Sequence, residues 1–254
     1  MAAMKRDATR ERIIQAACDL LARGGREALS TRAICAESGV QSPAIYRIFG
    51  DKQGLLDAVA GHGFESYLAD KASLGESDDP VDDLRRGWDL HIGFGVSNPA
   101  LYSLIYGDAR PGVETPAARR ASAMLARHIR RIAEAGRLRV SEERAAHLVH
   151  SAGRGMTFTL ISLPEDRRDP ALSTLAREAA IAAVTTAPAA TASDTTASAA
   201  TASATTGGAP AASADDPVRL AVALRAAAPR LTALTPAEHA LLREWMDRVA
   251  SPPA

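Results

Sequence analysis

The residues Ser30–Lys52 read STRAICAESGVQSPAIYRIFGDK and predict two short helices separated by a tight turn. Either Ser30 or Thr31 can cap the first helix, because a side-chain hydroxyl there accepts a hydrogen bond from an otherwise unpaired backbone N–H. Gly39 stands where the chain must reverse, and glycine adopts a positive φ without a steric clash at Cβ. The stretch therefore predicts a helix, a glycine turn and a second helix.

The second helix is expected over Pro43–Phe49, with Ser42 as its N-cap. A proline at the first helical position loses nothing, because the N–H that it lacks would have no partner there. Three apolar side chains are expected to pack inward, namely Ile45, Ile48 and Phe49. Two short helices joined by a glycine turn form a helix-turn-helix, and the second helix of this motif can enter the major groove of DNA.

Six residues make the pattern more specific than a bare helix-turn-helix: Ile34, Gly39, Val40, Tyr46, Phe49 and Lys52. Set between a short helix and an apolar helix, they resemble the DNA-binding domain of the TetR family of transcriptional regulators. The resemblance covers about Thr9–Leu68, and the rest of the chain matches in architecture and loose pattern. It implies an all-α protein, with a three-helix helix-turn-helix domain at residues 1–70 and a helical ligand-binding and dimerisation domain at residues 80–250.

The resemblance also implies which residues contact DNA. They are Thr31 and Arg32 at the start of the supporting helix, Gln41, Ser42, Pro43 and Ala44 at the leading end of the recognition helix, and Tyr46, Arg47 and Lys52 at the phosphates. Gln41 is the expected base reader, because its amide both donates and accepts hydrogen bonds. The alternative is that Tyr46 is a packing residue, Arg47 a solvated charge and Gln41 a turn residue.

Two small residues, Cys35 and Ser38, stand where the family usually has alanine, and packing should survive both. The chain has two cysteines, Cys18 and Cys35, and both fall on apolar positions of early helices. We expect them to be reduced and buried, because small intracellular domains seldom contain a disulfide.

The composition sets the broad class of protein. The 254 residues are 46% hydrophobic, which is enough for sizeable cores, and the formal net charge is zero. Zero net charge argues against a general attraction to polyanions but not against a local one, because residues 1–52 contain nine Lys and Arg against six Asp and Glu. The start is not a signal peptide, and no apolar run approaches the roughly 20 residues of a membrane span. We expect a cytoplasmic protein.

Two amphipathic helices flank the helix-turn-helix. The first is expected over Thr9–Arg23, capped by Thr9, with residues 1–8 as a mobile arm. The other is expected over Lys52–Asp70, capped by Asp51, and would connect the two domains. The polar loop before Pro80 predicts the domain boundary.

The rest of the chain reads as helices broken by proline and glycine. Their expected ranges are Pro80–Val96, Ala100–Tyr106, Thr115–Ala135, Ser141–Leu163, Pro170–Val184, Pro217–Ala227 and Pro236–Val249. Thr235 and Glu238 predict a capping box before the last helix. Residues 185–216 are nearly all Ala, Thr and Ser, so they cannot bury enough apolar surface to offset ordering and predict a disordered insertion. The dimer face is expected on Ser141–Leu163 and on a last helix near Leu241 and Trp245.

Eight residues of the second domain are candidates for an effector pocket: Trp88, His91, Phe94, Tyr102, Tyr106, His150, Met156 and Phe158. Apolar walls with a few polar groups suit a hydrophobic effector, while the alternative for each residue is ordinary core. His147 and His150 are three residues apart, but no third ligand has matching spacing, so no metal or other cofactor is expected. No constellation of catalytic residues is evident, and an enzyme is not expected.

These observations predict a homodimeric DNA-binding transcriptional regulator. Family logic makes it a repressor that a small hydrophobic effector releases from a near-palindromic operator. One alternative is a DNA-binding regulator that is controlled by a protein partner and has no small-molecule pocket. The other is an enzyme or ligand carrier that keeps this scaffold.

Overall fold

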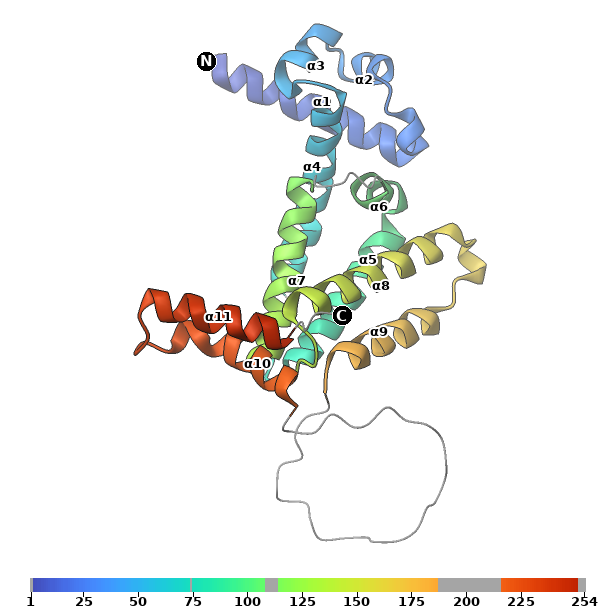
Figure 1. Cartoon of the computed structure of the whole chain (residues 1–254). Coiled ribbons are helices and arrows are strands. Elements are labelled where there is room, and N and C mark those ends of the chain that lie inside the picture. The colour runs from blue at the N-terminus through green and yellow to red at the C-terminus, as the bar shows by residue number, and fades with distance from the viewer. Residues whose placement is uncertain (1, 74, 108–113, 187–215, 251–254) are drawn as a thin grey trace. The chain divides into compact units, whose positions relative to one another are not determined.

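The computed structural model describes residues 2–73, 75–107, 114–186 and 216–250. Within these ranges the chain forms α-helices and short 3-10 helices without a β-strand, which confirms the predicted all-α class. The α-helices of Figure 1 are α1 (Ala2–Gly24), α2 (Thr31–Ser38), α3 (Ser42–Phe49), α4 (Lys52–Ser73), α5 (Pro80–Ser97), α6 (Pro99–Tyr106), α7 (Pro116–Glu134), α8 (Glu142–Ser162), α9 (Pro170–Val184), α10 (Pro217–Ala227) and α11 (Pro236–Ala250).

The chain divides into two compact units, residues 1–125 with 151–177 and residues 126–150 with 178–254. The first unit contains α1 to α6, and the second contains α10 and α11. The domain limits 1–70 and 80–250 stay a prediction. Most of the expected disordered insertion, residues 187–215, lies outside the described residues.

The helix α1 begins earlier than expected. It starts at Ala2, so the prediction of a mobile arm at residues 1–8 is wrong. The residues before Thr9 are mostly good helix formers, and no glycine or proline interrupts them. Thr9 therefore lies within the helix and is not its cap: its hydroxyl donates to the carbonyl of Lys5 at 2.8 Å.

One apolar core runs through the first unit. Ile13 of α1, Ile34 of α2 and Ile45 of α3 are at most 1% exposed and belong to the same cluster as Leu55 and Val59 of α4. The cluster continues into α6 and α7. Because α4 contributes both to the helix-turn-helix core and to the core around α6, the two parts of this unit share one hydrophobic interior.

The ends of α4 and α5 follow local signals. Asp51 accepts the backbone N–H of Gly54 at 2.7 Å, which confirms it as the cap of α4. The helix continues past the predicted Asp70 to Ser73. Asp79 caps α5 by accepting the N–H of Val81 at 2.8 Å.

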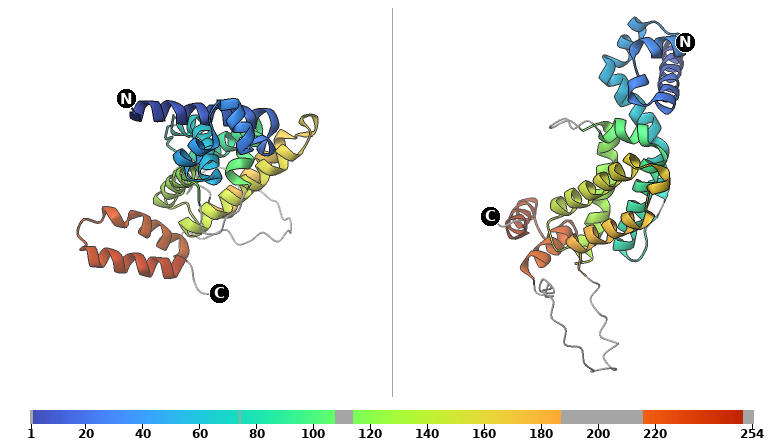
Figure 2. Two further views of the ribbon diagram at one scale, coloured as in Figure 1. Left: turned by 90° about the horizontal axis from the view of Figure 1, so that it is seen from above. Right: turned by 90° about the vertical axis from the view of Figure 1, so that its right-hand side faces the viewer.

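The second unit contains a hairpin of two helices, α10 and α11, which Figure 2 shows lying side by side. The predicted capping box of α11 is present: the Thr235 N–H donates to the Glu238 carboxylate at 2.7 Å, and the Glu238 N–H donates to the Thr235 hydroxyl at 3.4 Å. Arg225 of α10 contacts Glu142 of α8 at 3.1 Å and Asp247 of α11 at 2.5 Å. These ion pairs join three helices of the unit.

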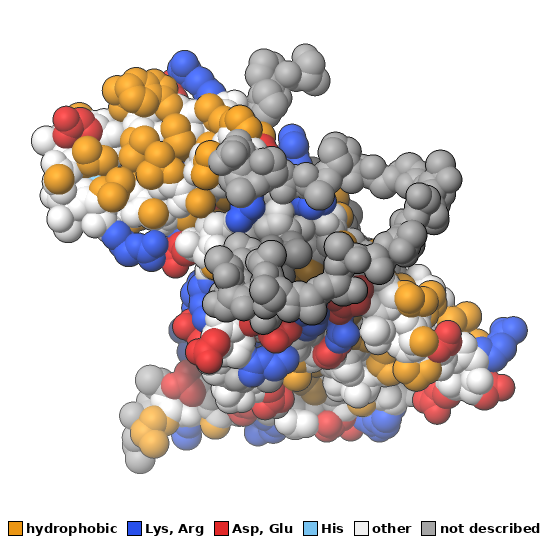
Figure 3. Space-filling model, turned by 90° about the horizontal axis from the view of Figure 1, so that it is seen from below, with side chains coloured by type: hydrophobic (Ala, Val, Ile, Leu, Met, Phe, Trp, Pro, Cys, Tyr) orange, Lys and Arg blue, Asp and Glu red, His pale blue; other side chains and the backbone are white. Residues whose placement is uncertain are grey.

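Large apolar side chains remain exposed on this hairpin, and Figure 3 shows hydrophobic side chains gathered on it. They are Leu220, Leu224, Leu231, Leu241, Trp245 and Val249, to which we refer as the hairpin patch. Trp245 is 51% exposed and Leu220 is 54% exposed. An apolar surface of this kind on a folded protein indicates an interaction site.

Among the described residues, no helix combines the length and apolar character that a membrane crossing requires.

Candidate nucleic-acid interface and effector site

The turn between α2 and α3 has the predicted geometry. Ser30 caps α2 by accepting the N–H of Ala33 at 3.1 Å. Gly39 ends the helix with φ 64°, a left-handed conformation that a residue with a Cβ adopts only under strain. Val40, which follows, is buried. The turn is thus held at both sides, and it fixes the direction in which α3 leaves α2.

The start of α3 differs from the expectation. Gln41 is the N-cap, and Ser42 is already helical, so the prediction of Ser42 as the cap is wrong. The carbonyl of Gln41 accepts the N–H of Ala44 at 2.9 Å, which closes the first turn one residue early. No side chain caps this end, and Gln41 and Pro43 are exposed to water. Because Pro43 has no N–H and the Ala44 N–H is already bonded, this helix end offers few backbone donors to an anion.

The outer face of α3 carries the predicted contact residues. Tyr46 is 45% exposed, and Arg47 and Lys52 are exposed as well. Ile45 points the other way and is 1% exposed. On α2, Arg32 is exposed, whereas Thr31 is half-buried. The structure thus leaves an aromatic ring and three cations open to solvent on and next to the helix-turn-helix.

The connection between α3 and α4 depends on a glycine that the sequence analysis did not single out. A Cβ on Gly54 would lie 2.1 Å from the carbonyl oxygen of Phe49, so no other residue fits without a shift of the backbone. The close approach positions Lys52 at the first residue of α4, directly after the recognition helix. The sequence signal that could have identified Gly54 is its position three residues after the capping Asp51.

Two side chains of α1 contact residues of the helix-turn-helix. Arg23 at the end of α1 forms an ion pair with Glu37 of α2 at 2.7 Å. The guanidinium of Arg10 lies over the ring of Phe49 at 5.8 Å from its centroid. Both residues of the ion pair are exposed, so this bridge contributes little to stability on its own.

Five of the eight predicted pocket residues meet in one aromatic cluster of the first unit. They are His91, Phe94, Tyr102, Tyr106 and Phe158, and their rings contact one another at centroid distances of 4.7 to 6.4 Å. Two aromatic residues of α4 that the sequence analysis did not assign to the pocket, Phe64 and Tyr67, join them. We call these seven residues the aromatic cluster.

A chain of hydrogen bonds runs through the cluster. Lys71 donates to the Tyr67 hydroxyl at 3.3 Å, Tyr67 lies 3.4 Å from Nδ1 of His91, and Nε2 of His91 lies 2.9 Å from the Tyr102 hydroxyl. Lysine can only donate, so the Tyr67 proton is directed toward Nδ1. We therefore assign the neutral tautomer in which Nε2–H of His91 donates to Tyr102.

Burial perturbs the ionisable groups of this chain. It lowers the pKa of Lys71 to about 8, because the charged ammonium is poorly solvated. It raises the pKa of Tyr67 well above its usual range and that of Tyr102 to about 12. The hydroxyls therefore remain protonated and available as hydrogen-bonding groups at neutral pH.

The other three predicted pocket residues are not part of these ring contacts, although Trp88 and His91 both lie against Gly153 of α8. Trp88 is 5% exposed, and its indole N–H donates to the Ser173 hydroxyl at 3.1 Å. Met156 is half-buried on α8. His150 belongs to the second unit. A cation next to the cluster was missed: Arg154 lies over Phe158 at 5.8 Å and donates to the carbonyl of Tyr106.

Both cysteines are free, as expected, but they are half-buried where full burial was predicted. Each lies on a helix flank that packs against the core on one side only. Ser38 is buried, and its hydroxyl donates to the Ile34 carbonyl at 2.6 Å. The departures from the family pattern thus leave the packing of the motif intact.

A capped helix, a left-handed glycine and an exposed second helix over a shared core define a helix-turn-helix domain. Residues 13–59 match the family model described as bacterial regulatory proteins, tetR family. The tetracycline repressor protein class C of Escherichia coli is 47% identical over 51 residues, which are 20% of this chain and 23% of the repressor. Over residues 13–59 the helix-turn-helix domain is thus similar to those of tetR family regulators.

Solved structures extend the likeness to the fold of most of the chain. A TetR family transcription regulator from Marinobacter aquaeolei VT8 is 19% identical, has a TM-score of 0.53, and covers 72% of this chain and 98% of its own. A bacterial regulatory protein in the tetR family from Rhodococcus RHA1 is 23% identical with a TM-score of 0.53, over 69% and 96% of the two chains. The chain has the fold of these regulators, while the curated repressor is matched over about a quarter of its length.

Proposed function

We propose that the protein is a DNA-binding transcriptional repressor that acts as a homodimer and leaves its operator when a small hydrophobic effector binds. The observation that carries the proposal is the exposed face of α3, with Gln41, Tyr46 and Arg47 open to solvent over the buried Ile45. A helix presented in this way on a TetR-type domain can lie in the major groove of DNA.

The contacts divide into two kinds. Arg47, Lys52 and Tyr46 bind phosphates and set the register of the domain on the duplex. The exposed Gln41 reaches base edges, where its amide can pair with adenine. Thr31 and Arg32 of α2, with Ser42, Pro43 and Ala44 at the start of α3, complete the interface.

Binding to the DNA upstream of the protein's own gene tests this proposal, measured by fluorescence anisotropy over a range of salt concentrations. Each phosphate contact contributes about 0.9 to the slope of log K against log salt. Arg47→Ala removes one contact per subunit, so the slope should fall by about 2 in a dimer. Arg120→Ala, which removes an exposed arginine of α7, is the control and should leave the slope unchanged.

The proposal fails if Arg47→Ala and the wild type have the same slope, or if the wild type does not bind at low salt. Gln41→Ala should instead leave the slope unchanged and relax the preference at one base pair of each half-site, by about 1 to 3 kcal/mol.

The hairpin patch supports the homodimer. Leu241, Trp245 and Val249 recur at a spacing of four residues on α11 and are exposed, and Leu148 of α8 in the same unit is 45% exposed. A self-complementary apolar surface is what a symmetric dimer buries. Two copies would then place their recognition helices about 34 Å apart on a near-palindromic operator.

Sedimentation velocity tests the dimer. Trp245→Glu places a charge in the apolar surface and should convert the dimer to a monomer, whereas Arg243→Glu, on the same exposed helix, should not. A Trp245→Glu variant that sediments like the wild type refutes this part of the proposal.

The effector site is proposed in the aromatic cluster. Phe94, Tyr102 and Phe158 offer apolar walls, and His91 and Tyr102 offer hydrogen-bonding groups. A compound that separates these rings would move α4, because Phe64 and Tyr67 of that helix belong to the cluster. Since α4 follows the helix-turn-helix directly, such a movement shifts the population of DNA-binding conformations.

Thermal shift against a library of hydrophobic compounds tests for the effector. A genuine effector should raise the melting temperature and weaken operator binding, and Phe94→Ala should reduce both effects. If no compound stabilises the protein, the effector part of the proposal is refuted and control by a protein partner is favoured.

A further inference from the structure

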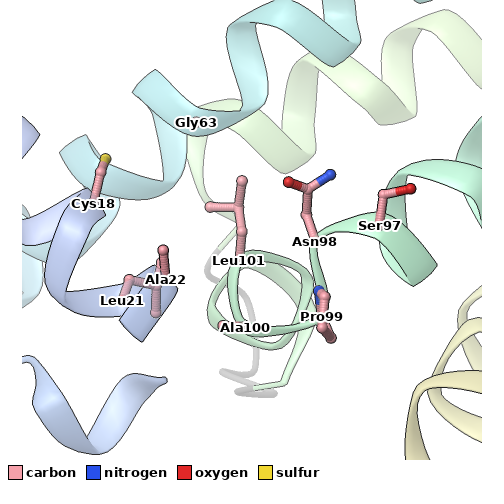
Figure 4. Close-up of a pocket in the computed structure, with 9 residues that line it drawn as sticks. All are labelled: Cys18, Leu21, Ala22, Gly63, Ser97, Asn98, Pro99, Ala100 and Leu101. Atoms are coloured by element: carbon pink, nitrogen blue, oxygen red, sulfur yellow. The ribbon is translucent and has the colours of Figure 1, made fainter. Parts of the chain in front are cut away.

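A pocket of about 370 Å³ lies in the first unit, and its lining includes no residue of the aromatic cluster or of α3. Figure 4 shows its walls: α1 contributes Cys18, Leu21 and Ala22, α4 contributes Gly63, and the chain from Ser97 to Leu101 closes the remaining side. Its volume is in the range of small-molecule sites. The pocket thus brings the first helix of the DNA-binding domain together with the start of α6.

The lining determines what the pocket can hold. None of its nine residues is charged, and the nearby carboxylates of Asp19 and Glu11 disfavour an anion. Leu21, Ala22 and Leu101 form an apolar part, and Ser97 and Asn98 form a polar part (Figure 4). The Asn98 amide nitrogen donates to the Phe94 carbonyl at 3.1 Å, which leaves its amide oxygen to accept from a ligand. These groups fit an uncharged molecule with one hydroxyl or amide donor.

The surroundings of the thiol in the pocket lower its thiolate fraction. Burial raises the pKa of Cys18, and the neighbouring carboxylates of Asp19 and Glu11 raise it further. The thiolate is the reactive form, so a group held protonated does not favour covalent capture of a ligand. Cys18 therefore contributes soft apolar surface, and binding is reversible.

One contact beside the pocket couples it to the helices. A Cβ on Gly63 would lie 2.7 Å from Cδ2 of Leu101, so Leu101 is seated directly against the backbone of α4. A ligand that fills the space between Leu21 and Leu101 would oppose any approach of α1 to α6. The bound ligand would thus keep α1 of the DNA-binding domain at a fixed distance from α6.

We propose that this pocket is a second regulatory site that binds a small uncharged amphiphile, such as a phenol or a cyclic alcohol, and thereby sets the DNA affinity of the helix-turn-helix. The effect on DNA rests on the proposed function, whereas the binding itself does not. The two can therefore fail separately.

Calorimetry on the full chain without DNA tests the binding, with 4-methylphenol as the probe. 4-Methylbenzoate, which has the same ring and a carboxylate, is the charged control and should bind at least tenfold more weakly. Ala22→Trp fills the pocket from α1, and because Ala22 is exposed the change does not enter the core. Ala8→Trp, at another exposed alanine of α1, is the matched control.

The expected result is saturable binding of 4-methylphenol to the wild type and to Ala8→Trp, with at least a tenfold loss in Ala22→Trp. Cys18 gives an independent measurement in the wild type. At pH 8.5 the probe should slow alkylation of Cys18 by N-ethylmaleimide, while Cys35, far along the sequence on α2, reports any general effect.

Binding that persists in Ala22→Trp, equal binding of the benzoate, or protection of neither cysteine overturns the proposal. If binding is found but operator affinity is unchanged by the probe, the pocket is a ligand site without the regulatory role, and that half of the proposal is refuted. A protein that binds the probe but no DNA contradicts the proposed function and leaves the site standing.

Discussion

The hydrogen-bond chain through the aromatic cluster can be tested by removing one hydroxyl at a time. In Tyr102→Phe the ring keeps its packing, and the variant loses the oxygen that accepts the 2.9 Å bond from His91 and that also hydrogen-bonds to the Thr157 side chain. Tyr102 is fully buried, so water cannot replace that oxygen. Depriving a buried donor of its acceptor costs about 1 to 3 kcal/mol.

Tyr67→Phe should cost less. The Tyr67 hydroxyl makes two contacts, with Lys71 at 3.3 Å and with His91 at 3.4 Å, and both are near the upper limit for hydrogen bonds. Long bonds are weak, so we expect a loss of about 0.5 to 1 kcal/mol. Because both tyrosines act on His91, the double variant should lose less than the sum of the two.

Urea denaturation at one fixed protein concentration, followed by circular dichroism, provides the free energies of unfolding. Tyr46→Phe is the control, since it makes the same chemical change at an exposed ring, and it should lie within about 0.5 kcal/mol of the wild type. If Tyr102→Phe is as stable as Tyr46→Phe, or if Tyr67→Phe is the more costly change, the relative strengths assigned to these hydrogen bonds are wrong.

Three further outcomes follow from local features. Lys71→Met removes the buried charge. Because the pKa of Lys71 is lowered to about 8, the wild type should gain stability relative to the variant as pH rises from 8 to 10.5, by at most about 1.4 kcal/mol per pH unit. A stability difference that does not change with pH, measured by urea denaturation, contradicts the burial of this ammonium. Ser30→Ala removes the cap of α2 and should destabilise the protein by about 1 kcal/mol in the same assay, whereas Ser30→Asp should retain the wild-type stability. Gly54→Ala places a methyl group against the Phe49 carbonyl and should lower the free energy of unfolding by about 1 to 3 kcal/mol and also weaken operator binding. Wild-type stability and wild-type operator affinity in this variant would show that the turn relaxes freely.

Local signals explain why the helix-turn-helix could be predicted from the sequence. Ser30, Gly39 and Asp51 each act on the backbone within a few residues of their own position, so their chemistry is visible in the printed chain. The capping box of Thr235 and Glu238 is predictable for the same reason.

The predicted starts of α1 and α3 were wrong because a second local signal competed with the predicted cap. Ser42 and Thr9 are both good capping residues, but the first turn of α3 closes on the Gln41 carbonyl, and the residues before Thr9 favour helix as strongly as those after it. Capping propensity alone cannot decide between two adjacent starts, because the stabilisation by a cap is comparable to that from a few helix-forming residues.

The aromatic cluster could be predicted only in part, because it is built by contacts between distant segments. Tyr67 is 24 residues from His91, and no helical spacing relates the two. His150 and Phe158 are both predicted pocket residues on α8, but the compact units divide this helix between them. Residues on one helix need not serve one core.

The two tryptophans of the chain have contrasting surroundings, so their intrinsic fluorescence can report on two different parts of the protein. Trp88 is enclosed, with its indole bonded to Ser173, so its fluorescence should be blue-shifted and protected from iodide. Trp245 lies exposed in the hairpin patch, so a quencher should reach it in a single chain, and the proposed dimer should exclude the quencher from it. One emission spectrum can therefore follow assembly and interior order at the same time, without a label.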